Sequence, residues 1–195
     1  MSSFTATSAT SNHNEETKET NKVNVTSTST SNAIILLYTN VINAELLPPA
    51  IGGVLIDLAY VVSHLHLESA LHKVLYNKNS RKKMSTDSIG ANICYALSSS
   101  KKMSETQKKY MVSSMSTNVA YILVDPTDEY LQSLKVSISD KNLAVEVTDT
   151  AFVESLMTPE KATELIAAFK ISPHELKVGS LEDAILMKIA VKESM

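Results

Sequence analysis

The sequence predicts an α+β fold, with a small mixed or antiparallel sheet, helices packed on it, a C-terminal helix and a disordered N-terminal tail. Two apolar runs, Ala33–Tyr38 and Val119–Val124, have the length and composition of buried strands. The segments between and after them carry apolar residues at spacings of three and four, which is typical of amphipathic helices. Because strands and helices follow one another irregularly, the order favours an α+β fold, or a small mixed sheet with helices on one face.

Residues 1–32 are predicted to form the disordered tail, and residues 33–195 a single domain. The first segment consists mostly of Ser, Thr and Asn, and Phe4 is its only aromatic residue. Such a segment cannot bury enough apolar surface to offset its ordering entropy. It also lacks the apolar stretch of a signal peptide, and no apolar run in the chain approaches the roughly 20 residues of a membrane span. We therefore expect no membrane association.

The first half of the domain is expected to start with the strand Ala33–Tyr38, which lies centrally because its apolar run is continuous. The segment Leu46–Pro49 predicts a short helix or turn, since its two prolines stop regular structure. The segment Val54–Val62 is apolar around Asp57, and it fits either a strand or a buried helical turn.

Three helices are predicted next. Apolar residues at spacings of three and four indicate helices at about His66–Asn77 and Thr86–Ser98. Ser104 suits the N-cap of a short helix that continues to Val112. The strand Val119–Val124 follows this third helix.

The last part of the chain predicts one strand and two main helices. The short strand is expected at Leu143–Val147. Thr158 and Pro159 form an N-cap followed by proline at the first helical position, which begins a helix that ends near Phe169. The segment Ser172–Glu175 is a second cap-like turn, and Ser180 opens the last helix, Ser180–Lys192, close to a capping box.

Composition argues against a catalytic or metal-dependent role. The chain has only four glycines and no glycine-rich phosphate loop, no CxxC and no HExxH motif, so we expect no enzyme activity and no cofactor. His64, His66 and His72 could be read as a metal site or as ordinary polar residues around a helix start. The second interpretation is favoured because no acidic or thiol ligand supports the first. Cys94 fits a buried structural thiol better than a nucleophile.

Charge and cysteine content indicate which partners and which cellular compartment to expect. The formal net charge is −3 with a pI near 6.0, so binding of a nucleic acid would require a local basic patch. Cys94 is the single cysteine, which precludes an intramolecular disulfide and fits a reducing compartment. We therefore expect the protein in the nucleus and cytoplasm.

Four segments resemble motifs of one family. They are Met103–Val112, similar to I-S-x-A-L-x-x-F-G-I, Ala168–Ser172, similar to I-Y-K-L-S, Gly179–Ile185, similar to G-x-L-x-D-A-I, and, more weakly, Asn40–Ala44, similar to D-V-x-N-A. Their joint order and spacing, from about residue 33 to the end, resemble the kinase-binding subunit of the KEOPS (EKC) complex.

The resemblance implies a non-catalytic accessory subunit. KEOPS makes the threonylcarbamoyl modification of the adenosine beside the tRNA anticodon, and a separate synthase subunit performs the chemistry. The family is expected to bind the small atypical kinase/ATPase of the complex directly and the other KEOPS subunits indirectly. It is also expected to help recruit tRNA through the 3′ end and to take part in telomere maintenance. Two alternatives are a generic protein-interaction domain and a small enzyme without a recognisable motif.

The sequence departs from the family pattern at four positions. Ser85 and Asp87 replace basic residues in a segment before a helix, and Asn92 replaces a glutamate. Met111 replaces the glycine of F-G-I, so a positive φ there would be sterically costly.

The C-terminal helix is the expected kinase-binding element, because it is apolar on more sides than one buried face requires. Leu181, Ile185 and Ile189 form the stripe expected to face the core, while Met187 and Val191 would face the partner. The candidate kinase-binding residues are Leu181, Ile185, Met187, Ile189 and Val191.

The best candidate for tRNA binding is the basic loop that follows the first predicted helix. A run of like charges can also be no more than a solvated loop, but the resemblance favours a role in binding. The two lysines near the end of the third helix are expected to lie close to the loop. The candidate residues are Lys78, Arg81, Lys82, Lys83, Lys108 and Lys109.

Overall fold

A five-stranded antiparallel sheet forms the centre of the molecule. The computed structural model describes residues 22–23, 32–80 and 84–192. Its strands are β1 (Lys22–Val23), β2 (Ala33–Thr39), β3 (Gly53–Asp57), β4 (Val119–Val124) and β5 (Val145–Val147). The order is β1-β2-β4-β3. β1 and β5 pair with the same edge of β2, because β4 occupies the opposite edge. β1 pairs with the N-terminal end of β2, and β5 pairs with its C-terminal end.

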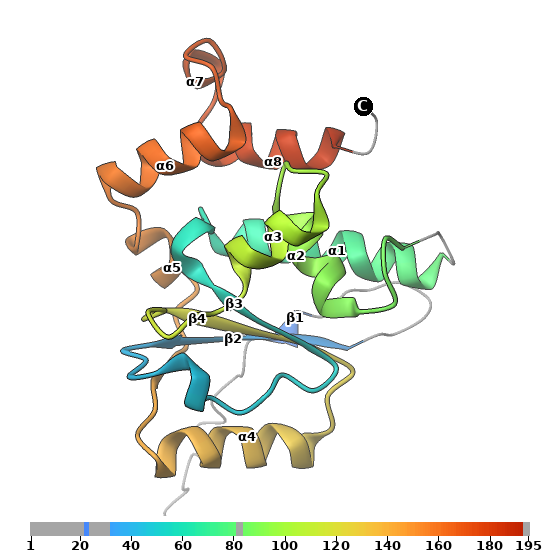
Figure 1. Cartoon of the computed structure of the whole chain (residues 1–195), viewed down its shortest axis with the longest axis vertical. Coiled ribbons are helices and arrows are strands. Elements are labelled where there is room, and N and C mark those ends of the chain that lie inside the picture. Colours follow the sequence, from blue (N-terminus) through green and yellow to red (C-terminus); the bar gives the residue numbers. More distant parts are fainter. Residues whose placement is uncertain (1–21, 24–31, 81–83, 193–195) are drawn as a thin grey trace, which may run out of the picture.

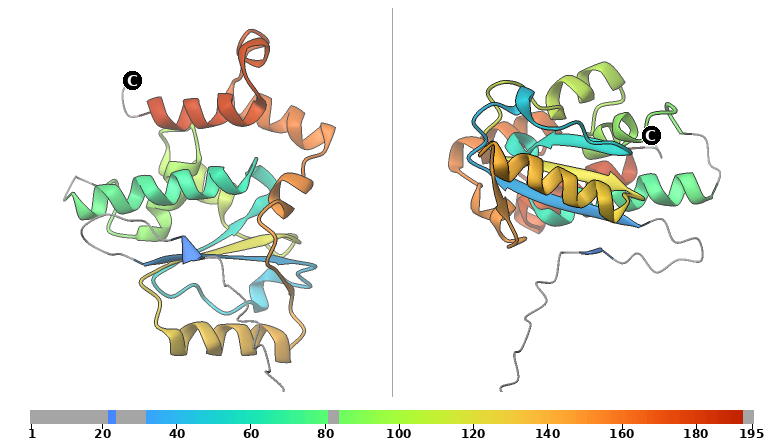
Figure 2. Two further views of the ribbon diagram at one scale, coloured as in Figure 1. Left: turned by 180° about the vertical axis from the view of Figure 1, so that it is seen from behind. Right: turned by 90° about the horizontal axis from the view of Figure 1, so that it is seen from below.

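The helices form layers on both faces of this sheet (Figure 1). α1–α3 cover one face and α4 covers the other, and α6–α8 lie beyond α1–α3, as the view from behind in Figure 2 also shows. No helix in the described ranges combines the length and the apolar composition needed to cross a membrane. The helices are α1 (His64–Asn79), α2 (Ile89–Leu97), α3 (Met103–Tyr110), α4 (Asp128–Asp140), α5 (Phe152–Ser155), α6 (Pro159–Phe169), α7 (Glu175–Val178) and α8 (Leu181–Val191), with 3₁₀ turns η1 (Ala44–Leu46) and η2 (Leu58–Tyr60).

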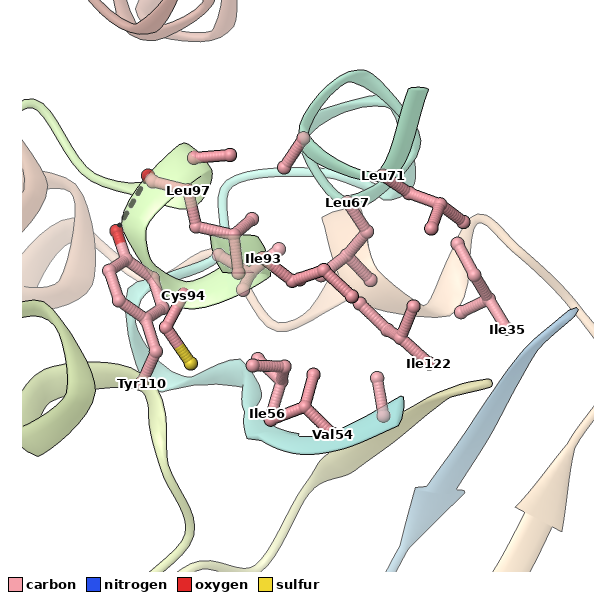
Figure 3. Close-up of a cluster of buried hydrophobic side chains, with 14 of the residues drawn as sticks. Ile35, Val54, Ile56, Leu67, Leu71, Ile93, Cys94, Leu97, Tyr110 and Ile122 are labelled. Atoms are coloured by element: carbon pink, nitrogen blue, oxygen red, sulfur yellow. Dashed lines mark hydrogen bonds between the residues drawn. The ribbon is translucent and has the colours of Figure 1, made fainter. Parts of the chain in front are cut away.

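The two central strands are buried on both faces. Along β2, Ile35 and Leu37 face α1 and α2, while Ile34 and Leu36 face α4. This explains why the strand reads as a continuous apolar run instead of an alternating one. Figure 3 shows the first of these cores, where side chains of the sheet meet those of α1 and α2. In the same core the Tyr110 hydroxyl donates a hydrogen bond to the Leu97 carbonyl (3.0 Å).

Several predicted elements are confirmed. The strand Val119–Val124 and the helix Pro159–Phe169 have the predicted bounds, and the Thr158 hydroxyl caps α6 by accepting from the Lys161 N–H (3.2 Å). The segment Val54–Val62 contains both predicted alternatives in succession, a strand and then a 3₁₀ turn. The first helix begins two residues earlier than predicted, because Ser63 is its N-cap.

Two features of the helices differ from the predictions. α4 and α5 were not predicted, and α4 covers the second face of the sheet, so the alternative with helices on one face does not hold. Ser104 is not an N-cap but lies within the first turn of α3, which begins at Met103 after Lys102 and has no side-chain cap. Of the predicted tail, only Lys22–Val23 and Asn32 are among the described residues.

Candidate functional site

The N-terminus of α8 is closed by the predicted capping box. The Ser180 hydroxyl accepts a hydrogen bond from the Asp183 backbone N–H (3.1 Å), and the Asp183 carboxylate accepts one from the Ser180 backbone N–H (3.0 Å). The Ser180 hydroxyl also donates to the carboxylate (2.7 Å), and these bonds hold the pKa of Asp183 below its usual value. The capping box fixes the residue at which α8 begins.

The inner face of α8 packs against α6 in a third apolar core. Ile185 and Ile189 are buried there against Leu165 and Phe169 of α6, and Leu181 packs against the same cluster while staying partly exposed. The prediction that Ile185 and Ile189 face the core is therefore confirmed. These side chains position the helix and leave its opposite face exposed.

Two lysines fix the C-terminal end of α8 to the layer below. Lys73 of α1 donates to the Ile189 carbonyl (3.0 Å), which lies in the last turn of α8, where a cation is favourable. Lys192 is only 4% exposed; its Nζ donates to the Tyr95 carbonyl of α2 (2.6 Å) and lies 3.1 Å from the Tyr95 ring centroid. The helix is thus held at both ends in one orientation.

The outer face of α8 is exposed, and beyond Asp183 in the first turn its exposed residues are apolar. The Met187 side chain is 62% exposed and Ala190 is also exposed, while Val191 is half-buried. α7, which an ion pair joins to α8, presents Val178, which is 91% exposed, and Leu176. We call Leu176, Val178, Met187 and Ala190 the α7–α8 surface.

An ion pair joins the two helices of this surface. Lys188 of α8 lies 2.8 Å from the Glu175 carboxylate of α7, and the Glu175 carboxylate also accepts from the Ser172 backbone N–H (2.7 Å). These bonds, the one from Lys188 first, lower the pKa of Glu175 to about 2. The sequence did not single out α7 as part of a surface, although Leu176 and Val178 stand as apolar residues in a polar turn.

The candidate tRNA-binding residues do not form one cluster among the described residues. Lys78 lies in the last turn of α1 and pairs with Asp125 (3.3 Å), just after β4. Lys108 is exposed at the end of α3, and Lys109 lies 4.2 Å from the Tyr60 ring centroid. Arg81, Lys82 and Lys83 lie outside the described residues.

Sheet geometry explains this separation. Asp125 follows the end of β4 that pairs with Gly53, whereas Tyr60 follows the end of β3 that pairs with Val119. Lys78 and Lys109 therefore lie at opposite ends of the β3–β4 pair. Lys78 is the basic residue of the predicted loop that falls within the described ranges. The expectation that Lys108 and Lys109 lie near the loop is not met for this residue.

The positions that depart from the family pattern have ordinary local structure. Ser85 and Asp87 are exposed, and Asn92 is buried, with its amide donating to the Thr86 and Ser88 carbonyls (2.7 Å each). Asn92 thus shapes the turn before α2. Met111 has φ −71°, so the backbone needs no glycine there.

The histidines and the cysteine lie apart from any shared ligand geometry. His66 is fully buried, and its Nε2 contacts the Leu97 carbonyl (2.9 Å), whereas the His64 ring contacts Glu68 (3.4 Å) and His72 is exposed on α1. No group of three or more His, Cys, Asp or Glu within the described ranges could hold a metal ion. Cys94 is buried, as predicted, and burial raises the pKa of its thiol to about 11.

Known proteins are similar to most of this chain. The family model described as kinase binding protein CGI-121 matches residues 38–193, from β2 through α8. The EKC/KEOPS complex subunit TPRKB of Danio rerio is 30% identical over an alignment of 169 positions, and the alignment covers 81% of this chain and 89% of that protein. The family match takes in β3, β4, β5 and all the helices described above, together with the last two residues of β2. The chain therefore belongs to the CGI-121 family of kinase-binding proteins.

Proposed function

We propose that this protein is a non-catalytic subunit of an EKC/KEOPS-type complex and that it binds the kinase of that complex through the α7–α8 surface. The observation that carries the proposal is the exposed apolar face of α8 on a helix whose other face is buried. Membership of a kinase-binding family and similarity to a protein named as an EKC/KEOPS subunit support the choice of partner.

The fixed position of α8 suits this role. The capping box and the lysine contacts at the other end order the helix before any partner arrives, which reduces the entropy cost of binding. Met187 provides a flexible apolar side chain that adapts to a partner surface. The binding mode is a helix lying against a hydrophobic surface.

The five predicted kinase-binding residues divide by exposure. Met187 makes direct contact in the proposal, and the half-buried Val191 lies at the rim. Ile185 and Ile189 act from the core by holding the helix in place, together with the partly buried Leu181. Val178 and Ala190 are added to the contact surface because both are exposed.

The kinase contact is tested with a charge placed on the surface. The double variant Val178→Glu, Met187→Glu should bind the purified kinase subunit at least tenfold more weakly in calorimetric titration, a change of about 1.4 kcal/mol. Its thermal unfolding should match that of the wild type, since both side chains are exposed. Val136→Glu is the matched control, because Val136 of α4 is 52% exposed on the opposite side of the molecule. Unchanged affinity in the double variant would contradict the proposed surface.

The proposal extends to tRNA. We propose that the subunit helps recruit tRNA by its 3′ end for threonylcarbamoyladenosine formation, and that it acts in the nucleus and cytoplasm, with a further role in telomere maintenance. The segment Lys78–Lys83 supports this with four positive charges in six residues, which can attract phosphates despite the net negative chain. Lys108 and Lys109 form a second, separate basic pair.

Separate variants distinguish the two basic regions. Replacing Arg81, Lys82 and Lys83 by Ala should weaken tRNA binding and flatten its salt dependence by about 0.7 in log–log slope for each phosphate that is no longer neutralised. The Lys108→Ala, Lys109→Ala variant shows whether the second region contributes. Binding by fluorescence anisotropy at several salt concentrations gives both quantities. Wild-type affinity and slope in the triple variant would remove the loop from the proposal.

A further inference from the structure

A cavity lies on the other face of the sheet, far from the α7–α8 surface. It has a volume of about 280 Å³ and lies between the C-terminal half of α4 and strand β5. Figure 1 places α4 on the opposite side of the sheet from α6–α8. The proposed kinase contact therefore does not use it. The cavity is lined by Tyr38, Lys135, Ile138, Ser139, Asn142, Ala144, Val145 and Glu146.

One of the residues that line this cavity carries a buried hydroxyl without a partner. Tyr38 of β2 is 2% exposed, and its ring packs edge-on against Tyr121 with centroids 5.6 Å apart. Within the described ranges, its hydroxyl is the one buried side-chain oxygen or nitrogen that lacks a hydrogen bond. The Tyr121 hydroxyl, in contrast, donates to the Pro48 carbonyl (2.9 Å). Because buried polar groups are almost always paired, the Tyr38 hydroxyl calls for a partner from outside the chain.

Charges around the cavity cancel. Lys135 of α4 and Glu146 of β5 form an ion pair of 2.6 Å across its rim. α4 ends at the same place with Asn142 in a left-handed conformation (φ 49°), and a helix C-terminus disfavours an anion. A cation is favoured by the same helix end, but Lys135 already neutralises the Glu146 carboxylate and its ammonium repels a second positive charge. The electrostatics thus favour an uncharged ligand.

The polar groups offer both donors and acceptors. Burial raises the pKa of the Tyr38 hydroxyl, which therefore stays protonated and can donate. The Glu146 carboxylate accepts, and the Ser139 hydroxyl and Asn142 amide can do either. Ile138, Ala144 and Val145 supply an apolar wall. The volume corresponds to roughly nine waters at about 30 Å³ each, which limits the ligand to a small molecule or one side chain.

We propose that this cavity binds the primary carboxamide of a small uncharged ligand, with the Tyr38 hydroxyl donating to the amide oxygen. A carboxamide carries two N–H donors and one oxygen acceptor in one plane, which matches the mixed lining. Such a group reaches the cavity either as a free small amide or as an Asn or Gln side chain of a peptide lying along β5.

The probe is benzamide, compared with benzoate and benzylammonium, which have a similar shape and carry a negative or positive charge. Titration of the full chain is followed by ¹H–¹⁵N correlation spectra, with dissociation constants near the millimolar range expected for so few atoms. Benzamide should shift the amide signals of Ser139, Asn142 and Val145, and the two charged analogues should bind at least tenfold more weakly. Equal binding of all three, or no localised shifts with benzamide, would overturn the proposal.

Matched variants separate the site from general stability. Tyr38→Phe should reduce benzamide affinity at least fivefold while leaving the thermal midpoint unchanged or higher, because it removes an unpaired buried hydroxyl. Tyr121→Phe should lower the midpoint and keep the affinity, since it breaks the bond to Pro48 outside the cavity. Wild-type benzamide affinity in Tyr38→Phe would overturn the proposal.

A second variant protects the test against a folding defect. Asn142→Gly keeps the left-handed helix end, which favours glycine, and removes the amide from the lining. It should weaken benzamide binding at least twofold, and unchanged binding in a folded Asn142→Gly protein would contradict the assigned lining.

A capped peptide with one glutamine between valines identifies the source of the amide. Binding tenfold tighter than benzamide assigns a peptide, and equal or weaker binding assigns a free amide.

Discussion

At the scale of single residues, His66 has the most constrained surroundings. Its Nε2 lies 2.9 Å from the Leu97 carbonyl, and its Nδ1 lies 3.5 Å from the Val62 backbone N–H, so the assigned tautomer carries its proton on Nε2. The ring is fully buried and packs edge-on against Phe169, with centroids 5.9 Å apart. Burial, together with the charges of Lys161 and Lys109, lowers the pKa of His66 to about 4.

This lowered pKa predicts a loss of stability in mild acid. The unfolded chain binds a proton near pH 6.5 and the folded chain only near pH 4, so stability is complete above pH 6.5 and falls as the pH drops toward 4. Between pH 7 and pH 5 the free energy of unfolding should decrease by roughly 2 kcal/mol through this group. Urea unfolding at the two pH values measures the decrease.

Variants assign the effect to His66. His66→Gln should be less stable at pH 7 but should lose less stability between pH 7 and pH 5 than the wild type. His72→Gln, on the exposed side of the same helix, should keep the wild-type decrease. A decrease of the same size in His66→Gln would show that other groups cause the acid sensitivity.

Some of these residue-level features could be predicted from the sequence, and others could not. His66 falls four residues before Ala70 and eight before Val74, so the helical period already places it on the buried face of α1. The unpaired Tyr38 hydroxyl gave no such signal. Its surroundings come from α4 and β5, about 100 residues further along the chain, and local periodicity does not show such contacts.

At the scale of elements, capping and spacing predicted α6 and α8 well but not α4. α4 has an N-cap at Thr127, whose side chain accepts from the Tyr130 N–H (3.2 Å), and buried Leu134 and Ile138 at a spacing of four. Its serines and β-branched residues have weaker helix propensity, which obscured this pattern. Packing of Leu134 and Ile138 against the sheet overcomes that weakness.

The two faces of α8 should differ strongly in their response to truncation. Ile189→Ala leaves a cavity among Leu165, Phe169 and Ile185, so the free energy of unfolding should fall by about 2–5 kcal/mol. Met187→Ala removes a side chain that is 62% exposed and should change it by about 0.5 kcal/mol or less. Chemical denaturation compares them, and similar losses in both variants would mean that Met187 belongs to the core.

At the scale of the whole molecule, the sequence predicted the class of fold but not how its parts meet. The apolar runs indicated which segments form strands, yet the pairing of β2 with β4, β1 and β5 depends on contacts far apart in the chain. The predicted kinase-binding helix has the expected buried stripe. Its attachment through Lys73, Lys192 and α7 could not be predicted, because these contacts join distant segments through polar groups that a periodic pattern does not identify.

The layered architecture predicts unequal stability across the molecule. β2 and β4 lie between two apolar cores, whereas α8 belongs to a third core that joins the rest through Val62, polar contacts from Lys73 and Lys192, and the neighbouring α6. Layers with less buried apolar surface open without global unfolding. Native-state hydrogen exchange should therefore give the Ile185 and Ile189 amides an opening free energy at least about 1 kcal/mol below that of the β4 amides. A kinase bound at 100 times its dissociation constant should raise the α8 value by about 2.7 kcal/mol. Equal opening free energies for α8 and β4 in the free protein would instead mean that the three cores unfold as one unit.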